Sequence, residues 1–355
     1  MQILMITYKE KKLSLFERLK KKILFWLHLT NDPVIKLYHG YGNDKKVIVF
    51  GHVFCLSSLP RKKYKKNFIN NTYGLLRLFM VKRYVNVILQ LQWDGIIYET
   101  KTQDDGYFKF EWSPANPIPS GWHPVKVHLL HSDVYVKPIE VMGEFFIPYK
   151  YEFAFVSDID DTFLISHSSN LRKRLYVLFT KNARSRKPFE GVVNHYQLLA
   201  NTGASRDTHN LFFYVSSSEW NLYDYIFEFA KNNKLPKGIY LLNQLKTFRQ
   251  VFKTGQNNHK TKFMRISRIM ETYPDQKFIL LGDDSQEDPN IYSAIVEHFP
   301  QNIYAVYLRH VLQSSHERVK GIVEKMKASG IHCCYFTHSS EAVINSKSIG
   351  LIPKD

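Results

Sequence analysis

Two aspartates that follow a short apolar segment could carry out phosphoryl transfer. The segment Phe153–Ser157 is short and apolar enough to be a buried strand, and Asp158 and Asp160 come directly after it. Such a strand has no use for carboxylates at its end unless they do chemistry there. In the spacing Asp-x-Asp-x-Thr, which ends at Thr162, one carboxylate can attack phosphorus and the other can transfer the proton of the leaving group. A divalent cation would neutralise the charge crowded between them.

Three further segments supply other groups of a phosphoryl-transfer site, in an order that chance explains poorly. Asn210–Val215 is expected to be a strand that ends in serines, and Lys277–Leu281 a strand that ends in acidic residues. Between them, Lys262–Tyr273 has apolar residues on one helical face and basic residues off it. The carboxyl ends of parallel strands in a doubly wound sheet converge on one crevice. We therefore expect the serines, the lysine and both acidic segments to meet there.

In combination, these motifs resemble the haloacid dehalogenase superfamily and, within it, the catalytic domain of the actin-patch-type phosphatidate phosphatases. The resemblance extends from about residue 153 to 311 and is carried by Asp158–Thr162, Tyr214–Leu222 and Gly282–Tyr292. It implies a magnesium-dependent phosphatase with an aspartate nucleophile. The roles that it implies are those of nucleophile, general acid/base, phosphate-oxygen donor, charge stabiliser and magnesium ligand, for Asp158, Asp160, Ser216, Lys262 and Asp283 respectively.

Two positions leave alternatives open. The segment 259–262 contains two candidates for the motif lysine, and although the helical register favours Lys262, a shift of one turn would make it Lys260. After the acidic strand, an aspartate replaces the serine that the family has, so either Asp284 or Asp288 can be the further carboxylate of the metal site.

The predicted site therefore contains three sets of residues. The catalytic set is Asp158, Asp160, Ser216 and Lys262. The substrate-binding set is Thr162, Ser217, Trp220 and Lys260. The set expected to bind Mg²⁺ consists of carboxylates, the ligands that this ion prefers: Asp158, Asp160, Asp283 and Asp288.

Length and composition indicate two domains and an N-terminal extension. The apolar content of 44% is enough for a sizeable core. We expect a basic amphipathic helix over residues 1–30 and a small all-β sandwich over residues 31–148, where runs such as Val85–Leu91 alternate between turn residues. Residues 149–355 are expected to form an α/β phosphatase domain with a doubly wound parallel sheet, like that of the haloacid dehalogenases.

The net charge of +17 indicates an anionic partner. Basic clusters at residues 20–22 and 61–66 would attract an anionic phospholipid membrane surface, or, as a weaker alternative, nucleic acid. In residues 13–27, apolar residues recur at helical spacing among lysines, as in a helix that lies in a membrane interface; a helix packed on the β domain fits equally well. Without a signal-peptide cleavage site and with only three cysteines, we expect a cytoplasmic, peripherally membrane-associated protein.

We predict from these features a magnesium-dependent phosphatidate phosphatase that releases diacylglycerol and phosphate through an aspartyl-phosphate on Asp158. The carboxylates indicate the chemistry, whereas the lipid phosphomonoester substrate follows from the resemblance and the basic amphipathic regions. Two alternatives stay open. One is a phosphomonoesterase that acts on a soluble or nucleic-acid-end phosphate. The other is a membrane adaptor without activity, although an adaptor has no reason to keep crowded carboxylates.

Overall fold

The computed structural model describes residues 33–56, 82–131, 139–149, 153–164, 188–202, 209–244 and 258–353. The predicted N-terminal helix and the basic clusters at residues 20–22 and 61–66 lie outside these ranges and stay predictions. Among the helices in the described ranges, none has both the length and the apolar character that a membrane span requires.

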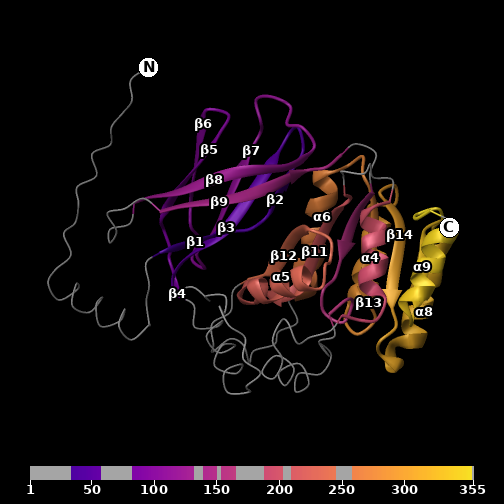
Figure 1. Ribbon diagram of the computed structural model, residues 1–355. Coiled ribbons are helices and arrows are strands. Elements are labelled where there is room, and N and C mark those ends of the chain that lie inside the picture. The colour runs from indigo at the N-terminus through magenta and orange to yellow at the C-terminus, as the bar shows by residue number, and fades with distance from the viewer. Residues whose placement is uncertain are drawn as a thin grey trace.

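The first part of the described chain is a nine-stranded sheet with its own apolar core (Figure 1). Its strands are β1 (Val34–Leu37), β2 (Gly40–Gly42), β3 (Val47–Leu56), β4 (Lys82–Arg83), β5 (Ile88–Trp93), β6 (Ile96–Lys101), β7 (Tyr107–Trp112), β8 (Gly121–His131) and β9 (Ile139–Ile147). They pair in the order β1-β3-β2-β9-β8-β5-β6, with β4 and β7 also paired with β3. All of these pairs are antiparallel except β2–β9.

The alternation of apolar and polar residues fixes which face of this sheet is buried. In β7, Phe108, Phe110 and Trp112 are buried, whereas Lys109 and Glu111 between them are exposed. The all-β character expected for residues 31–148 is therefore seen in the described part. Hydrogen bonds join its strands in one sheet, and the two facing sheets of a sandwich stay a prediction.

The second part is an α/β domain around a six-stranded parallel sheet with the order β12-β11-β10-β13-β14-β15. Its strands are β10 (Phe153–Ser157), β11 (Leu211–Glu219), β12 (Gly238–Asn243), β13 (Lys277–Asp283), β14 (Ile303–Arg309) and β15 (His332–Phe336). Its helices are α4 (Val192–Ala200), α5 (Tyr223–Asn232), α6 (Asn258–Thr272), α7 (Asp288–His298), α8 (His316–Ala328) and α9 (Ser339–Ser348). The predicted α/β class with a parallel sheet is confirmed. The haloacid dehalogenase-like assignment stays a prediction.

Helices cover both faces of the parallel sheet, so the strands bury side chains on both sides. α7 packs against α6 and α8, whereas α4 packs against α9. Phe163 contacts Tyr196 of α4 and Phe229 of α5, which places these two helices on one face. The strands accordingly read as continuous apolar runs, as in Phe278–Leu281, all of which are buried.

The two parts share an aromatic interface. The ring of Trp220, which directly follows β11, is stacked on Tyr38 between β1 and β2, with ring centroids 4.2 Å apart. Tyr41 meets Phe213 of β11 edge-on at 5.4 Å. The Tyr273 hydroxyl donates a hydrogen bond of 3.0 Å to the carbonyl oxygen of Gly42. In Figure 1 the antiparallel sheet accordingly lies against α6 and the β11–β12 side of the parallel sheet.

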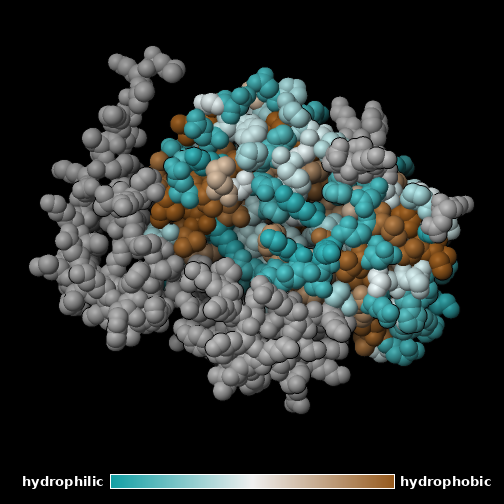
Figure 2. All heavy atoms as spheres, in the orientation of Figure 1, coloured by the Kyte–Doolittle hydropathy of each residue, from teal (hydrophilic) through white to brown (hydrophobic). Residues whose placement is uncertain are grey.

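Apolar residues also reach the outer surface, mainly at the ends of the molecule. In Figure 2, hydrophilic residues cover most of the middle of the visible face, and hydrophobic residues gather at the free end of the antiparallel sheet and over the C-terminal helices. The described apolar side chains with the largest exposed fractions include Ile344 of α9 and Met142 of β9. They are separate positions on different domains.

We expect the shared interface to make both parts unfold together. Trp220→Ala removes a buried ring from both packing surfaces and should lower the free energy of unfolding by about 3–5 kcal/mol. A single thermal transition, followed by circular dichroism and tryptophan fluorescence, should shift as a whole. Trp93→Ala, in the β domain and half-buried, is the matched control and should cost less. Two separate transitions in the wild type would contradict a shared interface.

Candidate active site

The carboxyl ends of three neighbouring strands bring the predicted groups to one edge of the parallel sheet. β10 lies between β11 and β13, and Ser157 is in register with Tyr214 on one side and Leu281 on the other. The amide of Asp158 continues this pairing with a hydrogen bond of 2.8 Å to the Leu281 carbonyl oxygen. The sheet therefore fixes the position of the backbone that carries the Asp158 side chain.

Helix α6 delivers a lysine to the Asp158 carboxylate. Its apolar residues Ile266, Ile269 and Met270 are buried, and this fixes the rotation of the helix about its axis. Lys262 is then directed inwards, where its Nζ lies 2.6 Å from Asp158 Oδ1 and also contacts Asp288 Oδ1. Lys262 is thus the lysine beside Asp158, whereas the side chain of Lys260 lies outside the described part of the chain.

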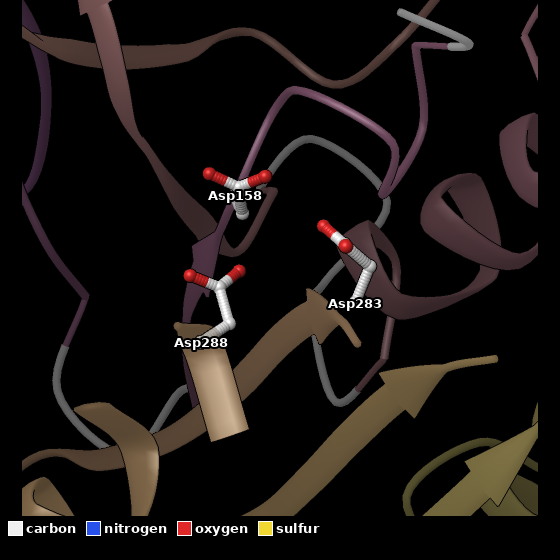
Figure 3. Close-up of side chains that lie close together, drawn as sticks. All are labelled: Asp158, Asp283 and Asp288. Carbon is white, nitrogen blue, oxygen red and sulfur yellow. The ribbon is translucent and has the colours of Figure 1, made fainter. Parts of the chain in front are cut away.

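Three carboxylates, those of Asp158, Asp283 and Asp288, lie close together (Figure 3). One oxygen from each of Asp158, Asp283 and Asp288 lies within 4.8 Å of the others, and the residues are 1%, 0% and 1% exposed. Lys262 is the cation paired with Asp158 and Asp288 among the described residues, so the three carboxylates carry more negative than positive charge when ionised. In addition, Asp288 Oδ2 is buried without a hydrogen-bond partner among the described residues. Buried charge of this kind requires protons or a cation.

The donor set fits a hard divalent ion. Carboxylate oxygens are the ligands of Mg²⁺, and the unpartnered Asp288 Oδ2 has the chemistry to complete such a set. The backbone at Gly282 lies close against Asp288. A Cβ at this position would lie only 2.8 Å from Asp288 Oδ2 and 2.7 Å from the Tyr292 ring. A glycine at this position keeps the first turn of α7 close to the end of β13.

Burial controls the protonation of the cluster. Burial raises the pKa of the Asp158 carboxyl well above its usual range, and the charges of Asp288 and Asp283 add to this, while Lys262 opposes it. Burial and Asp288 together raise the pKa of Asp283 to about 8. Burial works against the charge of Lys262, but the two carboxylates that it contacts raise its pKa overall, so the lysine stays protonated. Without a cation, the site therefore holds protons near neutral pH.

Asp160 occupies a different hydrogen-bonding environment from the three clustered carboxylates. It is half-buried, and its Oδ2 accepts hydrogen bonds from Ser216 Oγ at 3.1 Å and from Ser218 Oγ at 2.6 Å. The predicted metal-ligand role of Asp160 stays a prediction, because it is not part of the close group formed by the other three. Ser218 was not among the predicted site residues. The period-two alternation of a strand places it on the same side as Ser216, whereas the predicted Ser217 lies between them.

The remaining predicted residues divide between the site and the domain interface. Thr162 Oγ1 donates to Asp283 Oδ2 at 3.0 Å and to Asp158 Oδ2 at 3.3 Å, so it lies inside the cluster. Trp220, predicted to bind substrate, instead packs on Tyr38 in the domain interface. Its role in substrate binding stays a prediction.

The two candidate acidic residues after β13 face different ways. Asp288 lies in the carboxylate cluster, at the start of α7, with Pro289 in the first turn. Asp284 turns away, and its two oxygens are hydrogen-bonded by the amides of Val311 and Leu312, the His310 ring and the Tyr335 hydroxyl. Those donors hold the pKa of Asp284 below its usual range even though burial opposes them. Asp284 therefore ties the loop after β13 to β14 and β15.

A buried arginine supports the turn that carries the aspartates. Arg309 ends β14, and its Nε donates a hydrogen bond of 3.1 Å to the Thr162 carbonyl oxygen, while Nη2 donates to Ser339 Oγ at 2.8 Å. In the same turn, Asp161 has a φ of 60°, a conformation that aspartate tolerates better than most residues. Because Arg309 bonds backbone oxygen, no motif in the sequence indicated it.

The region that builds this site matches a known family. Residues 153–310 match the family model described as "Phosphatidate phosphatase APP1, catalytic domain". The match is shorter than half of the chain, but it contains the three clustered carboxylates, Asp160, Ser216 and Lys262. It supports the predicted resemblance to phosphatidate phosphatases, while the wider superfamily stays a prediction.

Two fungal proteins are similar over parts of their length. The phosphatidate phosphatase APP1 of Saccharomyces cerevisiae is 29% identical over 160 residues, which are 45% of this chain and 26% of the yeast protein. An uncharacterized protein of Schizosaccharomyces pombe is 23% identical over 219 residues, which are 61% of this chain and 35% of that protein. The matched regions thus span about a quarter and a third of these curated relatives.

Among solved structures, a carbohydrate acetylesterase from Xanthomonas citri aligns with 90% of this chain and 75% of its own. The sequence identity is 8% and the TM-score is 0.34. A similarity at this level carries no argument about fold or function.

The charge of the cluster predicts a metal-dependent stability with a definite dependence on pH. Between the unfolded pKa of about 4 and the folded pKa of Asp283, the metal-free folded state binds a proton that the unfolded state lacks. This group therefore makes the metal-free protein less stable as pH rises from 5 to 8. Mg²⁺ binds the ionised carboxylates, so the increase in Tm on adding it should grow over the same range.

Thermal unfolding with Mg²⁺ and with chelator, at several pH values, measures this effect. Asp283→Asn should reduce both the metal-induced increase in Tm and its pH dependence. Asp275→Asn, an exposed aspartate outside the cluster, should change neither. An increase in Tm that is the same in both variants would contradict the assignment of the cluster as a metal site.

Proposed function

We propose that this chain is a magnesium-dependent phosphatidate phosphatase that forms an aspartyl-phosphate on Asp158. The observation that carries the proposal is the contact of Lys262 Nζ with Asp158 Oδ1, 2.6 Å long and buried among further carboxylates. This contact lies within the residues that match the catalytic-domain family model. The lipid substrate rests on that match and on the yeast relative, whose name describes a phosphatidate phosphatase.

Asp158 is suited to be the nucleophile. Lys262 binds Oδ1 and favours the ionised carboxylate against the effect of burial, while Thr162 lies 3.3 Å from Oδ2. Attack by an oxygen of Asp158 on phosphorus forms an acyl-phosphate, and the bond from phosphorus to the alcohol oxygen breaks. The diacylglycerol alkoxide must then receive a proton. Water attacks the acyl-phosphate in the second step, which releases inorganic phosphate and restores the carboxylate.

Asp160 is the proposed general acid and base. As the acid it donates the proton that the leaving diacylglycerol needs, and as the base it takes a proton from the water that attacks in the second step. Ser216 and Ser218 both bond Oδ2, which fixes the orientation of the carboxyl group without involving the nucleophile. The two aspartates can therefore have separate tasks although only one residue lies between them.

Asp158, Asp283 and Asp288 are the residues that would hold Mg²⁺. When bound, the ion supplies positive charge to the transferring phosphoryl group and relieves the repulsion among the three carboxylates. Thr162 and the Ser285 amide, 2.6 Å from Asp283 Oδ1, keep the Asp283 carboxylate in place. The proposed localisation is cytoplasmic and peripheral at an anionic membrane, for which the net charge of +17 is the support.

The proposal predicts that Asp158→Asn abolishes phosphate release. In vesicles that contain phosphatidate and Mg²⁺, the variant should lose about a thousandfold or more of the activity, because the nucleophile is removed. Asp275→Asn is the matched control and should keep full activity. Chelator should abolish wild-type release.

Two further substrates separate the alternatives in the same assay. Release only from a soluble phosphomonoester or a 5′-phosphorylated oligonucleotide would contradict the lipid assignment and keep the chemistry. Absence of release from all of them would contradict enzymatic function and favour a membrane adaptor.

The hydrogen bonds of Asp160 predict a difference between adjacent serines. Ser218→Ala removes its 2.6 Å donor and should lower kcat by about tenfold, because general acid–base catalysis contributes on the order of 10²–10⁴ and depends on orientation. Ser217→Ala should change kcat by no more than about threefold, as expected for a substitution that removes none of these hydrogen bonds. Steady-state kinetics with phosphatidate measures both. Equal losses in the two variants would be inconsistent with the proposed role of Ser218.

A further inference from the structure

A cleft of about 1880 Å³ lies between the β domain and α6, beside the carboxylate site but separate from it. Its lining begins at Asn243, where β12 ends at the catalytic edge of the sheet, and continues along α6 to Tyr273. The 15 residues of α6 correspond to a length of about 22 Å. The cleft is therefore long enough to hold a ligand that does not touch Asp158.

Three cations lie on one row of α6, at successive turns. Lys262 is directed to Asp158, whereas Arg265 and Arg268, three and six residues further on, line the cleft. Arg265 Nη1 donates to the carbonyl oxygens of Ser216 and Leu241, at 2.7 and 3.3 Å. Neither arginine forms an ion pair with a carboxylate among the described residues. Arg265 is half-buried, and a guanidinium in such a place is stabilised by an anion.

Two phenols face the arginines from the β domain. Tyr41 and Tyr107 both line the cleft, and neither hydroxyl has a hydrogen-bond partner among the described residues. Tyr41 is only 5% exposed. Burial raises the pKa of Tyr41 to about 12 and that of Tyr107 still further, so both are protonated donors. The charge of Arg268 lowers the pKa of both phenols in part, whereas that of Glu111 raises it, and all four residues line the same cleft.

The acidic residues that line the cleft are Asp44, Asp105, Glu111, Glu271 and Asp275, and none of them forms an ion pair with either arginine within the described residues. Glu111 is paired with Lys46 at 2.5 Å and with Lys109 at 2.6 Å. Asp105 accepts a hydrogen bond of 2.9 Å from the amide of Tyr107. Glu271 lies one turn beyond Arg268, on the side away from the catalytic edge, and forms no ion pair with it. The end of the cleft nearest the carboxylate site therefore keeps an excess of hydrogen-bond donors and positive charge.

We propose that this cleft is a second binding site, for a phosphate oxyanion, formed by Arg265, Arg268, Tyr41 and Tyr107. Guanidinium and phenol groups are donors, and two arginines are a suitable match for phosphate. Arg268 lies about 9 Å along the helix from Lys262, so the bound phosphate is not the one that reacts. The ligand is either the headgroup phosphate of a phospholipid or free inorganic phosphate.

The site is coupled to the catalytic edge through Arg265. The same guanidinium that lines the cleft holds the backbone of Ser216, whose hydroxyl contacts Asp160. An anion bound to Arg265 in the cleft would therefore act on the backbone of Ser216 and, through the Ser216 hydroxyl, on Asp160. The β domain, which lies outside the matched family region, supplies both phenols. The cleft is therefore a property of the two-domain chain and does not depend on the proposed hydrolysis.

Isothermal titration calorimetry of the full chain in chelator tests the proposal without turnover. Without metal, Lys262 is paired with Asp158 and Asp288 and has no free charge to offer phosphate in the catalytic pocket. The probes are inorganic phosphate and a short-chain, monomeric phosphatidylglycerol, whose phosphodiester a monoesterase cannot cleave. We expect saturable binding at one site. Arg268→Gln should weaken it about tenfold or more, and Tyr107→Phe by a smaller factor.

Arg318→Gln is the matched control, because it removes the same charge from an exposed position on α8. It should leave binding unchanged, and unliganded Arg268→Gln should unfold at the wild-type Tm. Tighter binding of phosphatidylglycerol assigns the site to a lipid headgroup, and tighter binding of inorganic phosphate assigns it to the free ion. Absence of saturable binding to both probes, or equal effects of Arg268→Gln and Arg318→Gln, would overturn the proposal. Either result leaves the hydrolysis test unaffected.

Discussion

The arrangement of the catalytic domain depends on one electrostatic constraint: three buried carboxylates lie within 4.8 Å of one another, and Lys262 contacts two of them. Asp158, Asp283 and Asp288 come from a strand end, a second strand end and the start of a helix, and Lys262 comes from another helix. When the carboxylates are ionised, their mutual repulsion at low dielectric is larger than the stabilisation that any one hydrogen bond provides. Only a rigid scaffold can hold such groups together, and the parallel sheet with helices on both faces is that scaffold.

Helix α6 connects this site to the rest of the molecule. Its apolar face packs on the sheet, and its polar row passes from the nucleophile to the β11 strand end and then into the cleft. The β domain closes the other side of that cleft and stacks on the residue after β11. The small antiparallel domain is thus part of the surroundings of the site, because its aromatic residues share a core with the catalytic domain.

The sequence contained enough local information to predict much of the site. Asp158, Ser216 and Asp283 follow apolar strands directly, so a parallel sheet places them at one edge. The position of Lys262 followed from helical periodicity. By contrast, choosing Asp288 over Asp284 required the path of the turn before α7, and a local motif does not specify that path.

Residues that act through distant partners were beyond prediction. Strand alternation places Ser218 on the same side as Ser216, but the local sequence does not show that both hydroxyls contact Asp160, which lies more than 50 residues away in the chain. Trp220 follows the same strand, but its partner Tyr38 belongs to the other domain. Arg265 and Arg309 bond backbone carbonyl oxygens, which every residue has, and so leave no signature in the sequence.

Covalent catalysis at this site requires that a carboxylate oxygen of Asp158 form a bond to phosphorus. The most direct measurement is acid quenching during turnover of phosphatidate, followed by peptide mass spectrometry of the segment that contains residues 153–164. We predict a phosphate mass increment on Asp158 that disappears at alkaline pH, as an acyl-phosphate does, and is absent from Asp158→Asn. Turnover with no covalent phosphate on the chain, or with phosphate on another residue, would contradict it.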